Sequence, residues 1–341
     1  MSDAKKRIVW IDTLRGIAMC MVVLSHSRVA PCVIANLCWC CHVPLFFIIS
    51  GIMLGINQSE KLTLADFLKN KARGILYPYV TLSIIELIME YFTNKAGIKS
   101  SFIAFLSLDG IGVLWFLPTL FFSSVLWYFV KKIKNAIWVL AVAIVTAAAM
   151  SLYVVPNVPY AFIYILTRCI YATIFMLIGN IFYNHLEMIQ RYTRLVIMIG
   201  VLAYVYGNYY FSHYSFDLHY AQIMKPLSYW FITLGTSLLW ITIVSQLNKN
   251  VINKALSFIG RNTLIVLEGH WVLLQLLVNP YMKTLPIEKN ILELLNCVVM
   301  FIILIPIIKI INKKAMWIIR PVYQKNDLED SPCPLFVHVV Q

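Results

Sequence analysis

Long apolar stretches recur along the whole chain, and they limit the possible folds more than any other feature. A helix needs about 20 mostly apolar residues to cross a bilayer, and ten stretches meet this requirement. They lie at residues 8–27, 36–56, 74–93, 113–130, 136–154, 159–183, 193–211, 227–246, 262–280 and 290–311. Only 13% of the residues are charged, against about 25% in soluble domains. The sequence therefore predicts an all-α, polytopic membrane protein with about ten transmembrane helices.

The loops between these stretches are short, and the sequence contains no internal repeat, no Gly/Ser-rich linker and no second soluble domain. We expect residues 1–320 to form one membrane-embedded domain. Residues 321–341 are expected to form a polar tail that is unstructured or loosely attached. Asp12 and Arg15 interrupt the first stretch, and no small-residue cleavage site follows it. We therefore expect this stretch to remain in the mature protein rather than to act as a cleaved signal peptide.

The distribution of basic residues predicts the orientation in the membrane. With a cytosolic N-terminus, 20 of the 28 Lys and Arg residues fall in cytosolic loops and tails, six fall outside, and Arg15 and Arg168 lie within spans. This asymmetry follows the positive-inside rule. It explains the net charge of +13 without a nucleic acid partner. It also predicts cytosolic N- and C-termini for a multi-pass protein of the plasma membrane.

The eight cysteines show no spacing that is typical of a metal site, and we expect no metal cofactor. Cys38, Cys40 and Cys41 crowd one helix entrance, where they are interpreted as small apolar core residues. A disulfide from Cys32 to one of these three is the alternative, if the segment faces an oxidising compartment.

The first stretch carries Asp12, Arg15 and His26, although an ionisable group deep in a bilayer costs about 2.5–3.5 kcal/mol. A helix turns about 100° and rises about 1.5 Å per residue, so Arg15 and His26 share a face about 16 Å apart. Asp12 lies three residues from Arg15 and can pair with it. A buried ion pair that only fixes helix packing is one interpretation. The other is the wall of a hydrated cavity, because intramembrane ionisable groups usually mark pathways or sites.

These residue types suit the transfer of a group to a hydroxyl. Histidine changes its charge near neutral pH, and it can take a proton from a hydroxyl to make a nucleophile. Arginine cannot be deprotonated in proteins, but it binds carboxylates, phosphates and polarised carbonyls. His26 is therefore the candidate base, and Arg15 is the candidate for binding a charged or polarised group.

Other spans supply further polar groups. Glu86 and Arg168 are expected either to form a structural interhelical pair or to face a site. Glu268 and His270 are two residues apart on one helix, so they point about 200° away from each other. At most one of them can face the same cavity as His26.

Several residues near the ends of the spans have two interpretations each. His42 is either a packing histidine or part of the wall of an acceptor site. Trp115 is either an anchor in the aromatic belt or a platform on which a sugar stacks. The cytosolic mouth has a basic cluster, formed by Lys69, Lys71 and Arg73. It is either part of the ordinary excess of cytosolic basic residues or a site that binds the phosphates of a cytosolic group donor.

Four motifs occur in order along the chain. They read "IDTLRGIAMCMVVLSH" with Arg15 and His26, "HVPLFFIISG" from His42, "LWFLPTLFF" from Leu114, and "GRNTLIVLEGH" ending at His270. With these motifs the chain resembles the integral-membrane acyltransferase family three over about residues 7–312. It is most similar to the fucose 4-O-acetylase-like branch of sugar O-acetyltransferases.

The chain departs from the family pattern in three places. Val43 stands where the second motif usually has Met. Where family members often have two Arg three residues apart, the segment "KNKARGILYPY" offers Lys69, Lys71 and Arg73. Glu268 occupies a position that is usually apolar.

The resemblance implies a ten-helix enzyme that takes an acyl group from cytosolic acyl-CoA, usually acetyl-CoA. It would pass this group to a hydroxyl of a cell-envelope polysaccharide or lipid-linked sugar at the outer face. Covalent and direct transfer both stay open. The rival interpretations are a polysaccharide or lipid transporter or flippase without covalent chemistry, and the same enzyme class with another acyl group such as succinyl.

The resemblance also implies that His26 and Arg15 are the catalytic pair. From the residues themselves, we expect Asp12 to hold Arg15. The residues expected to bind the phosphates of the donor are Lys69, Lys71 and Arg73. The residues expected to bind the acceptor are His42, Trp115, Arg168, Glu268 and His270.

Overall fold

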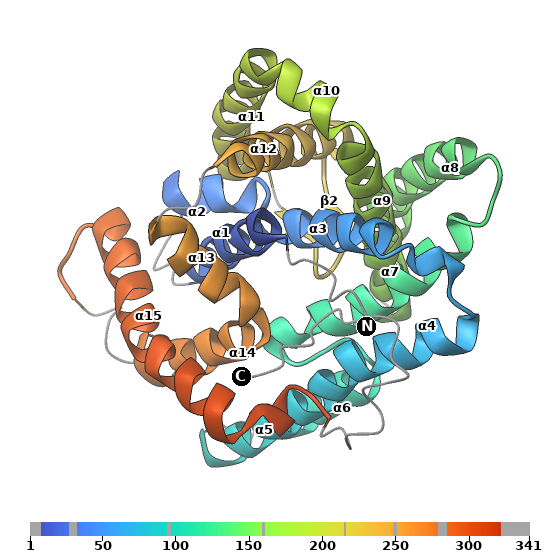
Figure 1. Cartoon of the computed structure of the whole chain (residues 1–341). Helices are drawn as coiled ribbons and strands as arrows, with labels where there is room; N and C mark the ends of the chain where they lie inside the picture. Colours follow the sequence, from blue (N-terminus) through green and yellow to red (C-terminus); the bar gives the residue numbers. More distant parts are fainter. Residues whose placement is uncertain are drawn as a thin grey trace, which may run out of the picture. The chain divides into compact units, whose positions relative to one another are not determined.

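The structure is a computed structural model, and it describes residues 8–26, 33–93, 97–158, 161–214, 216–247, 251–278 and 285–321. Cys32 and residues 322–341 of the predicted polar tail lie outside the described residues. Apart from one two-stranded hairpin, the regular elements of the described residues are helical (Figure 1).

The elements follow one another along the chain, with η marking 3-10 and π turns. The first half comprises α1 (Val9–His26), α2 (Val33–Trp39), α3 (His42–Ile56), η1 (Ser59–Lys61), α4 (Leu64–Lys71), η2 (Ala72–Leu76), α5 (Tyr77–Thr93), α6 (Ile98–Leu106), η3 (Gly112–Trp115), α7 (Phe116–Val130), α8 (Ala136–Ala149) and η4 (Met150–Val154). The second half comprises α9 (Ala161–Asn184), α10 (Leu186–Arg191), α11 (Thr193–His213), β1 (Phe216–Asp217), β2 (Gln222–Ile223), α12 (Pro226–Gln246), α13 (Val251–Arg261), α14 (Thr263–Leu273), η5 (Leu274–Val278), α15 (Lys289–Lys314) and η7 (Met316–Ile318).

Nine helical segments of the described residues are long and apolar enough to cross a bilayer, and they coincide with nine of the ten predicted spans. The prediction of an all-α polytopic membrane protein is confirmed. The remaining predicted span, 262–280, contains a shorter apolar helix at Thr263–Leu276. The cytosolic placement of the termini stays a prediction.

A proline explains why the second predicted span is divided into α2 and α3. Pro44 has no N–H, so it cannot donate to the carbonyl of Cys40, four residues earlier. The hydroxyl of Thr236 in α12 donates to that carbonyl at 3.2 Å instead. Such replacement is needed inside a bilayer, because no water is available there to satisfy a free carbonyl. The break makes His42 the first residue of α3.

The cysteines near this break lie in the core. Cys38, Cys40 and Cys41 are buried, as expected for small apolar core residues. The alternative of a disulfide to Cys32 falls outside the described residues and stays a prediction. The fold around α2 and α3 depends on packing and hydrogen bonds.

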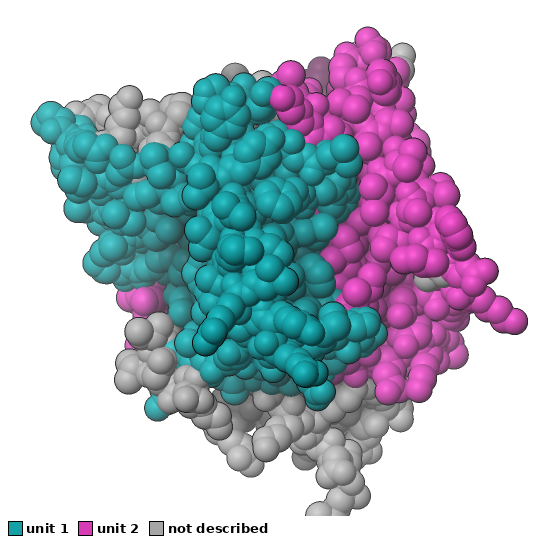
Figure 2. Space-filling view, turned by 90° about the horizontal axis from the view of Figure 1, so that it is seen from above, with its two compact units in different colours: residues 1–49, 182–214, 227–304 teal, residues 50–181, 215–226, 305–341 magenta. Residues whose placement is uncertain are grey.

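The chain forms two compact units, each assembled from three segments (Figure 2). Unit 1 comprises Met1–Ile49, Phe182–Tyr214 and Leu227–Leu304, and unit 2 comprises Ser50–Ile181, Ser215–Pro226 and Ile305–Gln341. The candidate residues Asp12, Arg15, His26, Glu268 and His270 belong to unit 1. The basic residues at the predicted cytosolic mouth belong to unit 2, as does Arg168.

In unit 1, α1 packs closely against α13 because each helix has a glycine at the contact. A Cβ on Gly16 would collide with the backbone of Leu256, and one on Gly260 would collide with the backbone of Asp12. Small residues allow this close approach of helix backbones in membranes. The contact fixes the helix that carries Asp12, Arg15 and His26.

In unit 2, α9 packs against the C-terminal part of α3 in the same way. A Cβ on Gly51 would collide with the backbone of Met176, and the side-chain amide of Asn180 donates to the carbonyl of Gly51. The short hairpin pairs Phe216 with Ile223 and Asp217 with Gln222 in antiparallel register. This hairpin belongs to the loop between α11 and α12.

Candidate active site

Three histidines of unit 1 form a group, here called the histidine group: His26, which is half-buried, and His42 and His270, which are buried. His26 is the last residue of α1, and its ring centroid lies 5.3 Å from that of His270 in α14, with the ring planes at 48°. The ring of Trp271 meets His26 edge-on at 6.1 Å. His42, the first residue of α3, lies in the neighbourhood of His26 in the same unit. His270 is fully buried, and His42 is only 7% exposed.

The three rings share one hydrogen-bonding pattern. In each, Nδ1 lies next to the backbone carbonyl four residues earlier. The acceptors are Val22 O at 2.9 Å for His26, Cys38 O at 3.0 Å for His42 and Val266 O at 2.8 Å for His270. Because a carbonyl oxygen only accepts, Nδ1 must carry the proton, which leaves a lone pair on Nε2 of the neutral ring.

This tautomer is the one that a general base requires. A neutral imidazole with a free Nε2 lone pair can take a proton from a hydroxyl within hydrogen-bond distance. The bond from Nδ1 to Val22 O also fixes the plane of the His26 ring. His26 is thus oriented by its own helix to accept a proton at Nε2.

The structure decides which of the two polar residues of α14 lies beside His26. His270 is in ring contact with His26. Glu268 lies two residues earlier on the same helix, so its side chain leaves the helix about 200° away. It is 5% exposed. Glu268 is therefore buried in a different direction from the histidine group.

Asp12 and Arg15 lie on α1 below His26. The helix is continuous from Val9 to His26, so the eleven residues from Arg15 to His26 correspond to about 16 Å along its axis. Asp12 is 6% exposed and Arg15 is half-buried. The two side chains therefore leave the same helix about three turns apart.

The basic residues at the predicted cytosolic mouth lie at a change in helix geometry. Lys69 is exposed, Lys71 is 7% exposed with its Nζ 5.6 Å from the ring of Phe67, and Arg73 is half-buried. Arg73 lies in the π turn η2, which forms where Pro78 cannot donate to the carbonyl four residues earlier. Such widened turns occur frequently at functional sites.

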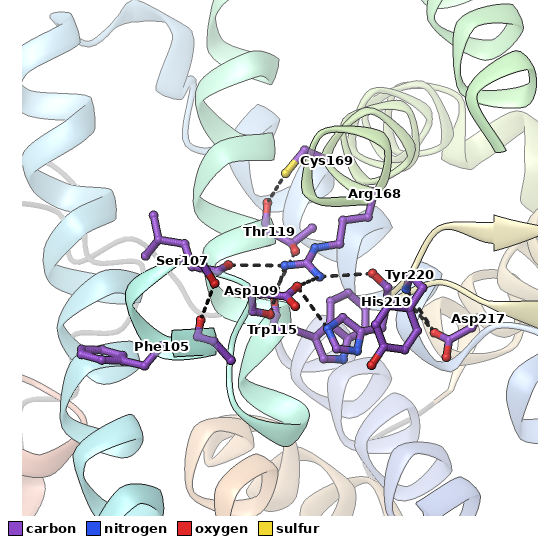
Figure 3. Close-up of polar contacts among 12 residues, drawn as sticks. Phe105, Ser107, Asp109, Trp115, Thr119, Arg168, Cys169, Asp217, His219 and Tyr220 are labelled. Carbon is purple, nitrogen blue, oxygen red and sulfur yellow. Dashed lines mark hydrogen bonds and ion pairs between the residues drawn. The ribbon is translucent and has the colours of Figure 1, made fainter. Parts of the chain in front are cut away.

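Arg168 is the centre of a second polar group, here called the arginine group: Asp109, Trp115, Arg168 and His219 (Figure 3). Its Nη1 donates to Asp109 Oδ1 at 2.8 Å and to the carbonyl of His219 at 3.1 Å. Its Nη2 donates to the carbonyls of Asp109 at 3.1 Å and Leu108 at 3.4 Å. The interhelical pair with Glu86 is not formed, because the carboxylate that binds Arg168 comes from a loop.

Aromatic rings complete the arginine group (Figure 3). The His219 ring stacks on Trp115 at 5.2 Å and on Tyr220 at 4.5 Å. The guanidinium carbon of Arg168 lies 5.4 Å from the centre of the Trp115 ring. Trp115 is thus in contact with protein groups and serves to hold the loops that contain Asp109 and His219.

These two loops contain strained backbone. Leu108 has a φ of 61° and Ala221 a φ of 54°, a region that non-glycine residues rarely adopt. Such strain persists only where surrounding contacts enforce it. Arg168 supplies those contacts, because its Nη atoms bind the backbone of both loops.

The charge state of Asp109 follows from its neighbours. Burial opposes ionisation of this carboxyl group, but the contact with His219 Nε2 at 3.3 Å and the charge of Arg168 outweigh it. The net result is a lowered pKa for Asp109, so the group stays ionised beside Arg168.

Sequence reasoning missed Asp109 and His219. The Asp-Gly turn just before Trp115 and the Tyr- and His-rich loop after α11 were the available signals.

Comparison with known proteins identifies the chain at the level of a family. A search of curated proteins and a search of solved structures gave no match. The model of acyltransferase family 3, described as an acyltransferase domain, matches residues 8–310. That range includes both polar groups and nearly all of the helices. The chain therefore belongs to acyltransferase family 3 and is a multi-pass membrane acyltransferase.

Proposed function

We propose that the protein is an O-acetyltransferase of the plasma membrane. It moves the acetyl group of cytosolic acetyl-CoA to a hydroxyl of a cell-envelope polysaccharide or lipid-linked sugar. The observation that carries this proposal is the contact of His26 Nδ1 with Val22 O at 2.9 Å, from which we infer a neutral ring with its lone pair on Nε2. A base is what a sugar hydroxyl needs to become a nucleophile.

In the proposed reaction His26 Nε2 takes the proton of the acceptor hydroxyl. The oxygen attacks the thioester carbon, a C–O bond forms, and the C–S bond breaks. The proton then passes from His26 to the leaving thiolate, which departs as CoA. His42, next to His26, is proposed to bind the acceptor.

We assign Arg15 to the donor rather than to the reacting carbonyl. The distance of about 16 Å along α1 suits a residue that binds a polar part of the donor on the cytosolic side of His26. Asp12 is proposed to orient Arg15. Lys69, Lys71 and Arg73 are proposed to bind the phosphates of CoA, because Lys and Arg are common phosphate ligands.

Trp115, Arg168 and Glu268 receive an indirect role. The Nη groups of Arg168 are bonded to protein acceptors, and Trp115 packs against His219. We therefore propose that Arg168 and Trp115 shape the acceptor side by fixing two loops, without binding the sugar directly. Glu268 points away from His26 and is proposed to contribute to helix packing.

The test replaces His26 by Asn. The Asn side-chain amide can still donate to Val22 O, but it offers no base. We expect the rate of CoA release from acetyl-CoA in the presence of envelope glycan to fall about 10²- to 10⁴-fold. His213→Asn is the matched control, because His213 makes the same bond to a carbonyl four residues earlier, at 2.8 Å, on the exposed end of α11.

Mass spectrometry of the glycan identifies the group that is transferred. An acetyl mass shift that requires active protein supports the proposal, and a succinyl shift would replace acetyl with another acyl group. Wild-type protein that releases no CoA would contradict the proposal and favour a transporter without covalent chemistry. Equal loss in the His26 and His213 variants would remove His26 from the chemistry.

A further inference from the structure

His270 has a hydrogen-bonding atom that the proposed reaction does not yet use. Its side chain is fully buried, with 0% of its surface accessible to solvent. Its Nδ1 is bonded to Val266 O, while its Nε2 has no hydrogen-bond partner among the described residues. A buried polar atom without a partner is costly, so its retention beside His26 requires an explanation.

The distance between the two rings suits a shared proton. A ring nitrogen lies ~1.2 Å from the centre of an imidazole, so an N–H···N bond of ~3 Å places two ring centroids ~5.4 Å apart. The observed separation of His26 and His270 is 5.3 Å, and the 48° between their planes is not that of a parallel stack. The centroid separation is therefore the one that an edge-to-edge bond between the two rings would have.

The tautomers assign the roles that the two rings would have in such a bond. Both Nδ1 atoms carry protons that are bonded to carbonyls, so both Nε2 atoms have lone pairs. Two acceptors cannot bond to each other. When His26 receives a proton at Nε2, it becomes a donor, and His270 Nε2 is the neighbouring acceptor.

Other titratable groups near His26 are less suited to this role. The elements packed most closely against α1 are α2, α13 and α14, α3 contributes His42, and Tyr204 of α11 packs against the cluster around Met21. Their titratable groups are Cys38, His42, Lys254, Arg261, Glu268 and His270, while α1 itself has Asp12, Arg15 and Cys20. Lys254 and Arg261 are exposed cations. Among the described histidines, only His270 is in ring contact with His26.

We propose that His270 is a positioning residue for the proton of His26: it accepts a hydrogen bond from the His26 imidazolium that forms when the acceptor hydroxyl is deprotonated. No further reactant is needed, because the proton stays on His26 and then leaves with the thiolate. The inference rests on the proposed function for its catalytic consequence. The proton-holding pair itself is a property of unit 1 and can be measured without turnover.

Two substitutions separate this role from packing. In His270→Asn the amide can still donate to Val266 O, but nothing occupies the position of Nε2. In His270→Gln the longer side chain can place an acceptor oxygen near that position. We expect Asn to lower kcat about 10- to 100-fold with an unchanged KM for acetyl-CoA, and Gln to restore most of kcat. The acid limb of the pH–rate profile should move to lower pH in the Asn variant, because protonated His26 has lost its partner.

Nitrogen NMR of histidine-labelled protein measures the pair directly. The midpoint at which the His26 ring becomes protonated should move about one to two pH units lower in His270→Asn, since a charge-assisted hydrogen bond is lost. His213→Asn should leave it unchanged. An unmoved midpoint in the Asn variant would overturn the inference, even if activity fell. A moved midpoint in a protein that transfers no acetyl group would support the pair and reject the proposed function.

Discussion

The histidine group of unit 1 and the arginine group of unit 2 both lie in apolar surroundings, but they use their polar atoms differently. In the histidine group each Nδ1 is bonded and each Nε2 keeps a lone pair. In the arginine group both Nη atoms of Arg168 are bonded to protein oxygens, and only its Nε lacks a hydrogen-bond partner among the described residues. The histidine group therefore has ring nitrogens that can still accept a proton, whereas nearly every polar atom of the arginine group is already hydrogen-bonded.

The difference indicates how polarity inside a membrane protein can be assigned to chemistry or to structure. A neutral ring with an unused lone pair can gain a proton and then lose it. A buried cation surrounded by a carboxylate and carbonyls is already in its most stable arrangement, and disturbing it leaves charges without partners. We therefore expect substitutions in the histidine group to change rates, and substitutions in the arginine group to change stability.

Arg168→Met gives the largest expected effect on stability. The substitution leaves the Asp109 carboxylate and three backbone carbonyls without the donor that now binds them. Removal of one partner of a buried pair costs about 3–5 kcal/mol. Chemical unfolding of the purified protein in detergent measures this loss.

Arg191→Met is the control for this experiment, since Arg191 is an exposed arginine at the end of α10. It should leave the free energy of unfolding nearly unchanged. If Arg168→Met lowered activity while matching the stability of the control, Arg168 would bind substrate and the comparison would fail.

Gly260→Ala tests how the histidine group is held in place, with a smaller expected effect. The new Cβ would collide with the backbone of Asp12, so α1 and α13 must separate. Overpacking of this kind typically costs about 1–3 kcal/mol. The movement of α1 should also lower the rate of acyl transfer, because this helix carries Arg15 and His26.

Gly269→Ala is the matched control in α14. The Cβ at this position would meet only the end of the Leu304 side chain, which can rotate away. Thermal unfolding of both variants measures the loss of stability, which should be the smaller for Gly269→Ala. The reverse order would mean that α13 does not fix α1.

The sequence predicts much of the histidine group and little of the arginine group. The spacing of Arg15 and His26 is sufficient to place them on one face, because helix geometry is regular over eleven residues. The same geometry shows that only one of Glu268 and His270 can face His26, but tertiary packing decides which. Asp109 could not be assigned to Arg168, because it lies in a loop 59 residues away and loop conformation has no period. The sequence offers Glu86 as a candidate partner because Glu86 lies in a span.

The ninth predicted span, 262–280, reaches the edge of the described residues. Helical structure runs through α14 and the π turn η5 as far as Val278, and the apolar helix within it is Thr263–Leu276. The break between α2 and α3 is different, because Pro44 shows from the sequence alone that one backbone N–H is missing. The sequence does not show that the hydroxyl of Thr236 takes the place of this donor.

The pH dependence of stability gives the smallest expected effect. The pKa of Asp109 is lower in the folded protein than its ordinary value, so its ionised form stabilises the fold. This contribution is complete at pH values above ~3.9, the pKa of an unfolded aspartate. It is lost as the pH falls through the lower pKa of the folded state.

Asp109→Asn tests this contribution, because the variant keeps an oxygen that can accept from Arg168 but has no charge. The Tm of the variant should therefore lie below that of the wild type at neutral pH, and the gap should close on acidification. Glu187→Gln, at an exposed position of α10, should show no such closing. A gap that stays constant down to acid pH would mean that the charge of Asp109 contributes nothing. The arginine group would then depend on its backbone hydrogen bonds alone, and its contrast with the neutral histidine group would disappear.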